Sequence, residues 1–291
     1  MKPAPFDYHD PATLDEAVSL LGRLDDDVKI LAGGQSLIPL LNMRLARPTA
    51  LVDLGKITEL DYIREDGGAI AIGALTTQRT VEHSQLVRER LPVLYEATRL
   101  IAHPQIRNRG TIGGSLAHAD PAAEYPAVAL LLDAEFKIRS ASGERTLGAA
   151  DFFVTYLTTA LGPADVLTEV RFPLLANGVG WSFIEMTRRH GDFALAGAGA
   201  TLTLSGDECS GARIVLFGVD ATPVRAKGAE QALVGQRLSE ELIASAAQIA
   251  REETGEPLSD NHASAEFRRH LAGVMTERAL TEAAGRAGWT N

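Results

Sequence analysis

The sequence predicts an α+β protein built in two parts, and three observations support this prediction. In the first half, short apolar runs rich in β-branched residues alternate with helical patterns, as in a βαβ unit with a parallel element. After Pro173 the order changes to three strand-like runs followed by helical patterns, which is typical of a separate α+β unit. The chain has 291 residues, more than the roughly 100 to 200 of one typical domain. We therefore place a boundary near residues 174–178.

The first half begins with a predicted helix. Thr13-Leu14-Asp15-Glu16 fits a capping box, in which Thr13 accepts from a first-turn amide and Glu16 reaches back, so a helix is expected over 13–24. Residues 28–32 form an apolar run typical of a buried strand, 37–45 a short helix, and 50–54 a second strand. Further strands are predicted at 69–72, 135–139 and 166–172, and helices near 92–102 and 124–133.

The second half begins with a glycine-containing connection, 174–180. Three strands are predicted at 181–187, 196–204 and 212–220, separated by turn-rich spacers. Helical patterns then occupy 226–234, 239–253 and 264–286, and the apolar periodicity of the last indicates a core-facing helix rather than an interface.

Charge and cysteine content exclude several functions. Asp and Glu number 38 against 28 Lys and Arg, and the net charge of −10 disfavours a non-specific hold on nucleic acid or an anionic membrane. No apolar run approaches about 18 residues, and the first residues lack the apolar core of a secretory signal, so we expect a cytoplasmic protein without a membrane span. Cys209 is the sole cysteine, so this chain alone forms no internal disulfide and no Cys-ligated iron–sulfur cluster.

Two glycine-rich segments are the main candidates for a binding site. Gly33-Gly34-Gln35-Ser36 follows the strand at 28–32, and Gly110-Thr111-Ile112-Gly113-Gly114-Ser115 lies farther along. Backbone amides and hydroxyls of this kind suit a phosphate, although a tight structural turn would also explain the first glycine pair. Neither segment matches a P-loop or Gly-x-Gly-x-x-Gly, and Gly197-Ala198-Gly199 lies within a strand pattern, where close strand packing explains it better. The residues predict a diphosphate-bearing ligand held between two loops.

Three segments in order carry a family resemblance: AGGQSLIPLLNMRLARPTALVDL, HPQIRNRGTIGGSLAHADPAAEYPAV and RRHGDFALAGAG. Together they resemble the FAD-binding medium subunit of the molybdenum hydroxylases, a family that includes aerobic carbon monoxide dehydrogenase and the flavin domain of xanthine dehydrogenase. The resemblance implies a two-subdomain FAD-binding fold of the vanillyl-alcohol-oxidase type over residues 1–175, with subdomains of about 1–55 and 56–175. It implies a C-terminal domain over 176–291, with a three-stranded antiparallel sheet and helices.

The resemblance also implies which residues bind FAD and no catalytic or metal-ligating residue. In the family the first segment wraps the FAD diphosphate, the second contacts the diphosphate and ribityl chain, a carboxylate binds the ribityl hydroxyls, and two side chains flank the isoalloxazine ring. Carried over to this sequence, these are Ile30, Leu31, Ala32, Gly33, Gly34, Gln35, Ser36 and Leu37; Thr111, Ile112, Gly113, Gly114 and Ser115; Glu124; and Leu167 with Phe193.

By the same resemblance, electrons come from two [2Fe-2S] clusters of a small partner subunit and pass through FAD to quinone, oxygen or another acceptor. A large partner subunit with the molybdenum cofactor oxidises carbon monoxide, an N-heteroaromatic compound, a purine or an aldehyde, within a dimer of heterotrimers. This sequence departs from the family at Ser115, often Asn, and at Ile184 and Glu185, where several relatives carry a lysine near the flavin. Arg188 or Arg189 is a candidate replacement for that cation.

Other interpretations stay open at this point. His103, His118 and His190 are candidate acid–base groups or structural caps, and Arg107, Arg109, Arg188 and Arg189 are candidate phosphate clamps or surface residues. Asp120 with Pro121 is better explained as a helix start than as a carboxylate partner of Glu124. The alternative functions are a self-contained flavin oxidase of the same wider fold, and a scaffold protein that has lost its ligand.

Overall fold

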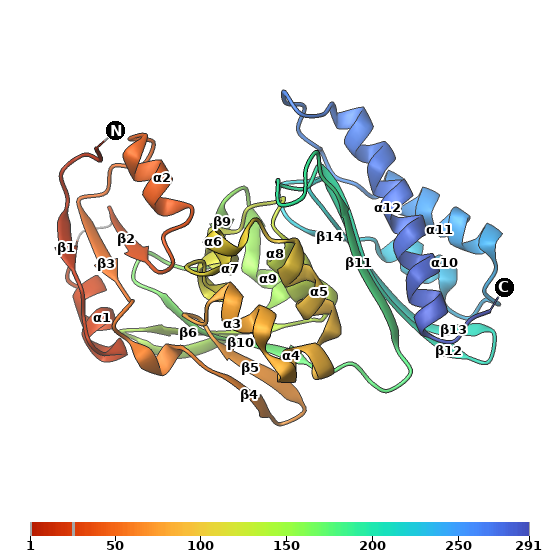
Figure 1. Ribbon diagram of the computed structural model, residues 1–291, viewed down its shortest axis with the longest axis horizontal. Coiled ribbons are helices and arrows are strands. Elements are labelled where there is room, and N and C mark those ends of the chain that lie inside the picture. The colour runs from red at the N-terminus through yellow and green to blue at the C-terminus, as the bar shows by residue number, and fades with distance from the viewer. Residues whose placement is uncertain (1, 25–26, 291) are drawn as a thin grey trace.

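The structure is a computed structural model that describes residues 2–24 and 27–290. Its three main sheets follow one another along the long axis of the molecule, from the N-terminal end to the C-terminal end (Figure 1). One layer of helices lies between the second and third sheets, and three further helices cover the other face of the third sheet (Figure 1). The α+β class predicted from the sequence is confirmed.

The first sheet is parallel, with the order β1 (Asp7–His9), β3 (Ala50–Asp53) and β2 (Val28–Leu31). Helix α1 (Leu14–Leu21) connects β1 to β2, and helix α2 (Leu37–Asn42) connects β2 to β3. The capping box is confirmed: the Thr13 hydroxyl accepts from the Glu16 amide at 3.2 Å, and the Glu16 carboxylate accepts from the Ala12 amide at 2.9 Å. The helix ends three residues earlier than expected.

The second sheet is antiparallel, so the parallel element is confined to the first sheet. Its order is β4 (Ile63–Asp66), β5 (Ala69–Gly73), β10 (Val166–Pro173), β6 (Glu135–Ser140) and β7 (Gly143–Gly148). The helices beside it are α3 (Gln78–His83), α4 (Gln85–Arg90), α5 (Pro92–Leu100), α6 (Pro104–Arg107), α7 (Ile112–His118), α8 (Glu124–Leu131) and α9 (Ala149–Phe152). Smaller elements are the 3-10 helix η1 (Thr58–Leu60) and the ribbon of β8 (Phe153–Thr155) and β9 (Thr158–Thr159).

The third sheet is antiparallel, with the order β11 (Gly180–Met186), β12 (Ala196–Ser205), β13 (Glu208–Phe217) and β14 (Val224–Arg225). The three predicted strands are present, and the structure adds the two-residue β14 at the edge. Gly197 lies under the Phe217 ring, which a Cβ at this position would overlap, so close strand packing explains this glycine as expected. Helices α10 (Lys227–Leu233), α11 (Glu240–Glu252) and α12 (Ala265–Arg286) follow, and α12 buries an alanine-rich face on β11 and β12.

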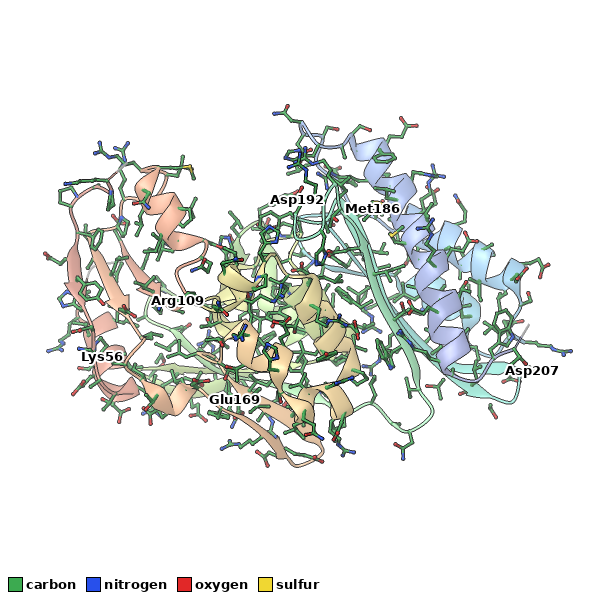
Figure 2. All side chains as sticks on the ribbon, in the orientation of Figure 1. Lys56, Arg109, Glu169, Met186, Asp192 and Asp207 are labelled. Carbon is green, nitrogen blue, oxygen red and sulfur yellow. The ribbon has the colours of Figure 1, made fainter. Side chains whose placement is uncertain are left out.

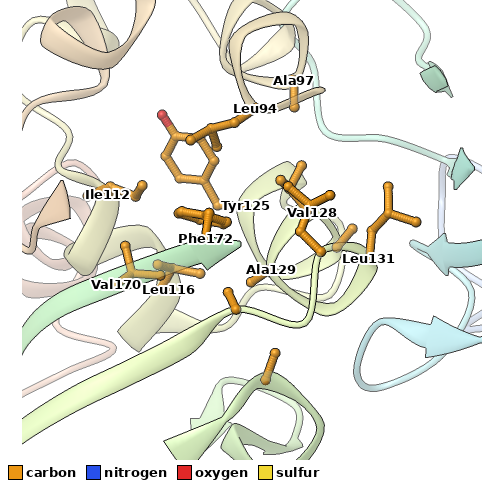
Figure 3. Close-up of a cluster of buried hydrophobic side chains, with 14 of the residues drawn as sticks. Leu94, Ala97, Ile112, Leu116, Tyr125, Val128, Ala129, Leu131, Val170 and Phe172 are labelled. Atoms are coloured by element: carbon orange, nitrogen blue, oxygen red, sulfur yellow. The ribbon is translucent and has the colours of Figure 1, made fainter. Parts of the chain in front are cut away.

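The core beside the second sheet fixes the two helices that matter for the site. Ile112 and Leu116 of α7 and Tyr125 of α8 pack with Phe172 of β10 (Figure 3). Every residue of α8 is buried. Helices α7 and α8 are therefore held rigidly against β10, and the segments at their N-termini are positioned with them.

None of the helices within residues 2–24 and 27–290 is long and apolar enough to cross a membrane.

Candidate cofactor site

The two glycine-rich segments meet in space. A Cβ on Gly33 would overlap the Arg109 carbonyl oxygen and lie 2.8 Å from the Gly110 Cα, so the two backbones touch. Figure 2 labels Arg109, which lies between the first sheet and the helices of the second. A cleft of about 620 Å³ opens at this contact, lined by both segments and by residues 191–193 of the C-terminal half. This volume lies within the range of about 300–1,000 Å³ typical of sites for organic ligands.

The first segment presents unpartnered donors to the cleft. Gly34 has a positive φ of 73°, a conformation that L-residues with side chains rarely adopt. Within the described residues, the backbone amides of Gly34, Gln35 and Ser36 donate to no protein acceptor, and all three residues line the cleft. Successive free amides of this kind form a concave surface that binds anions.

The second segment differs from the prediction. Instead of a loop with free amides, it begins α7, with Thr111 as its N-cap. The amide of Ile112 donates to Thr76 at 3.0 Å, that of Gly113 to Ala74 at 2.9 Å, and that of Gly114 to the Thr111 hydroxyl at 3.0 Å. The expectation of free amides in the second segment is therefore wrong for Ile112, Gly113 and Gly114.

The glycines of the second segment serve two purposes. A Cβ on Gly113 would lie 2.6 Å from the Ala74 oxygen and 2.8 Å from its Cα, so this glycine lets α7 pack on the end of β5. A Cβ on Gly114 would meet the Thr111 hydroxyl at 2.8 Å and Ala32 of the first segment at 3.6 Å. Because Gly114 has no side chain, the space between the two segments stays open at this point of the cleft.

Two carboxyl groups meet near the cleft. Glu124 begins α8, lines the cleft and is only 7% exposed. Burial, together with the nearby carboxyl of Glu185 on β11, raises the pKa of Glu124 well above its ordinary value. Burial also raises the pKa of Glu185 to about 7, and its Oε2 is enclosed without a hydrogen-bond partner in the described part of the chain. Both shifts favour the neutral form of the carboxyl, and Glu124 presents its carboxyl at the cleft.

Fourteen of the sixteen predicted FAD-binding residues line this one cleft. The exceptions are Leu31 and Ile112, and the Ile112 side chain is fully buried in the core (Figure 3). Leu167 is 6% exposed in the cleft wall, whereas Phe193 is 67% exposed. The prediction did not include several residues that also line the cleft, because they belong to no glycine-rich motif: Lys29, Leu75, Gln78, His118, Asp120, Leu157, Leu161 and Asp165.

The arginine and aspartate residues that the sequence offered as further candidates have different surroundings in the structure. Arg107 is buried and pairs with Glu82 at 2.9 Å, so it holds α6 to α3 and does not face a ligand. Arg188 pairs with Asp192 at 3.9 Å near the cleft, where Figure 2 labels Asp192. The Asp120 carboxylate accepts from the Ala122 amide at 2.9 Å, so Asp120 forms a turn before α8, whose N-cap is Ala123 rather than Asp120. No group of three or more His, Cys, Asp or Glu within the described chain is arranged to hold a metal ion.

The residues of the cleft fit a dinucleotide. Three free amides can bind a diphosphate, and the glycine segments leave no side chain where the two backbones converge. The raised pKa of Glu124 favours its neutral carboxyl, which suits a hydroxylated, uncharged part of a ligand.

Comparisons with known proteins agree with this geometry. Residues 4–175 match the model of the FAD-binding domain in molybdopterin dehydrogenase, and residues 181–283 match the carbon monoxide dehydrogenase flavoprotein C-terminal domain. The chain is 44% identical over 288 residues to the 6-hydroxypseudooxynicotine dehydrogenase complex subunit alpha of Paenarthrobacter nicotinovorans, covering 99% of this chain and 97% of that protein. It is 41% identical to the carbon monoxide dehydrogenase medium chain of Hydrogenophaga pseudoflava, with 97% of this chain and 98% of that protein covered.

Solved structures are similar throughout the chain. A carbon monoxide dehydrogenase from Hydrogenophaga pseudoflava superposes with a TM-score of 0.96 at 42% identity, covering 98% of this chain and 99% of that one. Quinoline 2-oxidoreductase from Pseudomonas putida 86 superposes with a TM-score of 0.95 at 40% identity, covering 99% of this chain and 100% of that one. The chain therefore belongs to the family defined by the FAD-binding domain of the molybdopterin dehydrogenases, as its sequence predicted.

Proposed function

We propose that this chain is the FAD-carrying, electron-transfer subunit of a molybdenum hydroxylase complex. The observation that carries the proposal is the cleft in which three unpartnered amides, two converging glycine segments and a buried carboxyl face one another. When bound, FAD accepts electrons singly and releases them as a pair to an external acceptor such as quinone or oxygen. The residues of the chain bind, orient and shield it.

Each part of the cleft has a role in this proposal. Gly34, Gln35 and Ser36 donate their amides to the diphosphate, and Gly114 leaves space beside it. Glu124 binds the ribityl hydroxyls, which can both donate to and accept from a neutral carboxyl. Leu167 and Phe193 flank the isoalloxazine ring, a buried residue on one side and an exposed one on the other. The other predicted residues that line the cleft contact the cofactor through the same two segments, whereas Leu31 and Ile112 do not line it and support the segments from behind.

Partner subunits supply the rest of the reaction. We infer a small subunit with two [2Fe-2S] clusters and a large subunit with the molybdenum cofactor, arranged as a dimer of heterotrimers. Cys209 is buried, and the chain has no second cysteine with which to ligate a cluster. The relatives are named as the medium chain of carbon monoxide dehydrogenase and as subunits of caffeine and xanthine dehydrogenases. Carbon monoxide, an N-heteroaromatic compound, a purine or an aldehyde is therefore the substrate class of the complex, chosen by the large subunit.

We also propose that residues 1–175 and 176–291 are the two domains, with subdomains of about 1–55 and 56–175. The order of the sheets supports this division, since the three main sheets lie within 1–55, 56–175 and 176–291, respectively. A cytoplasmic location, expected from the charge and the lack of long apolar runs, is part of the same proposal.

Purification from the native host tests the function. We expect a flavin absorption spectrum, release of FAD on denaturation, and two further chains that co-purify with iron and molybdenum. A chain that carries FAD but purifies alone with full oxidase activity would instead support a self-contained flavin oxidase. A colourless chain that takes up no added FAD would contradict both functions.

A further inference from the structure

A buried amide in the cleft has no partner in the protein. Gln78 is the first residue of α3, lines the cleft and is only 5% exposed. Within the described residues, neither its Oε1 nor its Nε2 makes a hydrogen bond; Oε1 is fully enclosed, whereas Nε2 is not. Buried side-chain amides are nearly always hydrogen-bonded, because an unpaired buried polar group destabilises a protein. Because Oε1 is enclosed, Nε2 is the atom of this amide that can pair with a ligand in the cleft, and as an N–H donor it requires an acceptor.

The amide lies where the two glycine-rich segments meet. A Cβ on Gly110 would lie 2.6 Å from the Gln78 Oε1 and 3.0 Å from its Cδ, so the missing side chain of Gly110 makes room for the carboxamide. On its other side Gly110 adjoins Gly33. The Gln78 backbone amide donates to the Gly110 oxygen at 2.7 Å, which fixes the start of α3 to this segment.

The chemistry of this junction favours a phosphate partner. No charged side chain belongs to either glycine segment from Gly33 to Ser36 or from Gly110 to Ser115, so these two segments themselves offer only neutral donors to a diphosphate. A carboxamide offers two N–H donors, and a hydrogen bond to a charged acceptor is stronger than one between neutral groups. Gln78 adds a side-chain donor next to the free amides of the first segment.

We propose that Gln78 is a binding residue for the diphosphate of the cofactor, its Nε2 donating to a phosphate oxygen, and that Gly110 is the positioning residue that seats it. The proposal rests on the FAD-binding function above and names a contact outside both glycine motifs.

The test compares binding with stability in Gln78→Met, which keeps the length of the side chain and removes its polar atoms. Cofactor-free wild-type and variant protein are titrated with FAD, with ADP and with riboflavin, and melting temperatures are measured without ligand. We expect the affinity for FAD and ADP to fall about tenfold to a hundredfold, as for the loss of one hydrogen bond to a charged group, and the affinity for riboflavin to stay unchanged. The melting temperature of the cofactor-free variant should equal or exceed that of the wild type, since an unpaired amide is removed.

The matched control is Gln85→Met on α4, where the side chain is exposed and donates to Glu89 at 2.7 Å; FAD affinity should stay at the wild-type value. Gly110→Ala should weaken FAD binding to a similar extent, and the double variant with Gln78→Met should be no weaker than either single one.

Unchanged FAD and ADP affinity in a folded Gln78→Met protein would overturn the assignment of Gln78, as would equal losses for riboflavin with a lowered melting temperature. Additive losses in the double variant would overturn the positioning role of Gly110. If the wild-type protein itself fails to bind FAD, the proposed function is overturned, and the inference about Gln78 with it.

Discussion

The buried carboxyl pair makes the stability of the cofactor-free protein depend on pH. Glu185 on β11 lies near Glu124 of α8, and Asp120 of the preceding turn also lies near Glu124. Burial raises the pKa of Glu185 from its ordinary 4.5 to about 7. A carboxyl with a raised pKa in the folded state stabilises the fold fully at low pH, and this stability is lost as the pH rises through about 7.

The size of this effect follows from the pKa difference. With a pKa near 7 in the folded protein and 4.5 in the unfolded chain, the unfolding free energy decreases by about 3 kcal/mol over the whole titration of Glu185. About 2 kcal/mol of this should be lost between about pH 5.5 and about pH 8.5. In Glu185→Gln the position no longer titrates, so the unfolding free energy should fall less over this range. Above neutral pH the variant should be the more stable protein.

Urea unfolding of the cofactor-free protein at both pH values measures the difference. Glu256→Gln, at an exposed position, is the control and should keep the pH dependence of the wild type. Equal pH dependence in the wild type and Glu185→Gln would refute the reasoning, because Glu185 would then titrate as it does in the unfolded chain.

Three further substitutions test individual positions of the cleft. Gly113→Ala should lower the unfolding free energy of the cofactor-free protein by about 1–3 kcal/mol, measured by urea unfolding, because its Cβ would press on the Ala74 backbone. Gly114→Val should eject FAD, since its side chain would enter the cleft wall; full flavin absorbance in the purified variant would contradict the assignment. Phe193→Ala should retain FAD and keep its melting temperature, because Phe193 is 67% exposed, while the flavin potential or acceptor reactivity shifts. An unchanged redox titration and turnover would count against this placement.

The sequence predicted most elements that bury a regular apolar face. The strands at 69–72, 135–139 and 166–172 and the helices at 239–253 and 264–286 appear within a few residues of their predicted bounds. Elements without such a pattern were missed. Strand β4 (Ile63–Asp66) and strand β7 (Gly143–Gly148) are largely exposed edge strands, so their sequences lack the alternation that marks a half-buried strand.

The candidate site shows a different limit of sequence reasoning. A glycine pair indicates that a backbone needs space, yet it does not say whether a ligand or another part of the chain takes that space. At Gly34 the conformation and the free amide point to a ligand, whereas at Gly113 the Ala74 backbone occupies the space. Gln78 carried no signal at all, because its importance comes from a missing partner that only the folded chain reveals.

The charges around Glu124 and the first segment favour one direction for a dinucleotide bound in the cleft as proposed. Asp120 and Glu124 line one part of the wall, with Glu185 behind them, and a diphosphate placed there would meet repulsion or further raise the pKa of the pair. The segment from Gly33 to Ser36 carries no acidic group, and Lys29 of β2, four residues before Gly33, also lines the cleft. The diphosphate is therefore favoured at the first segment and an uncharged, hydroxylated part at Glu124. This orientation coincides with the roles that the family resemblance implies for the two regions.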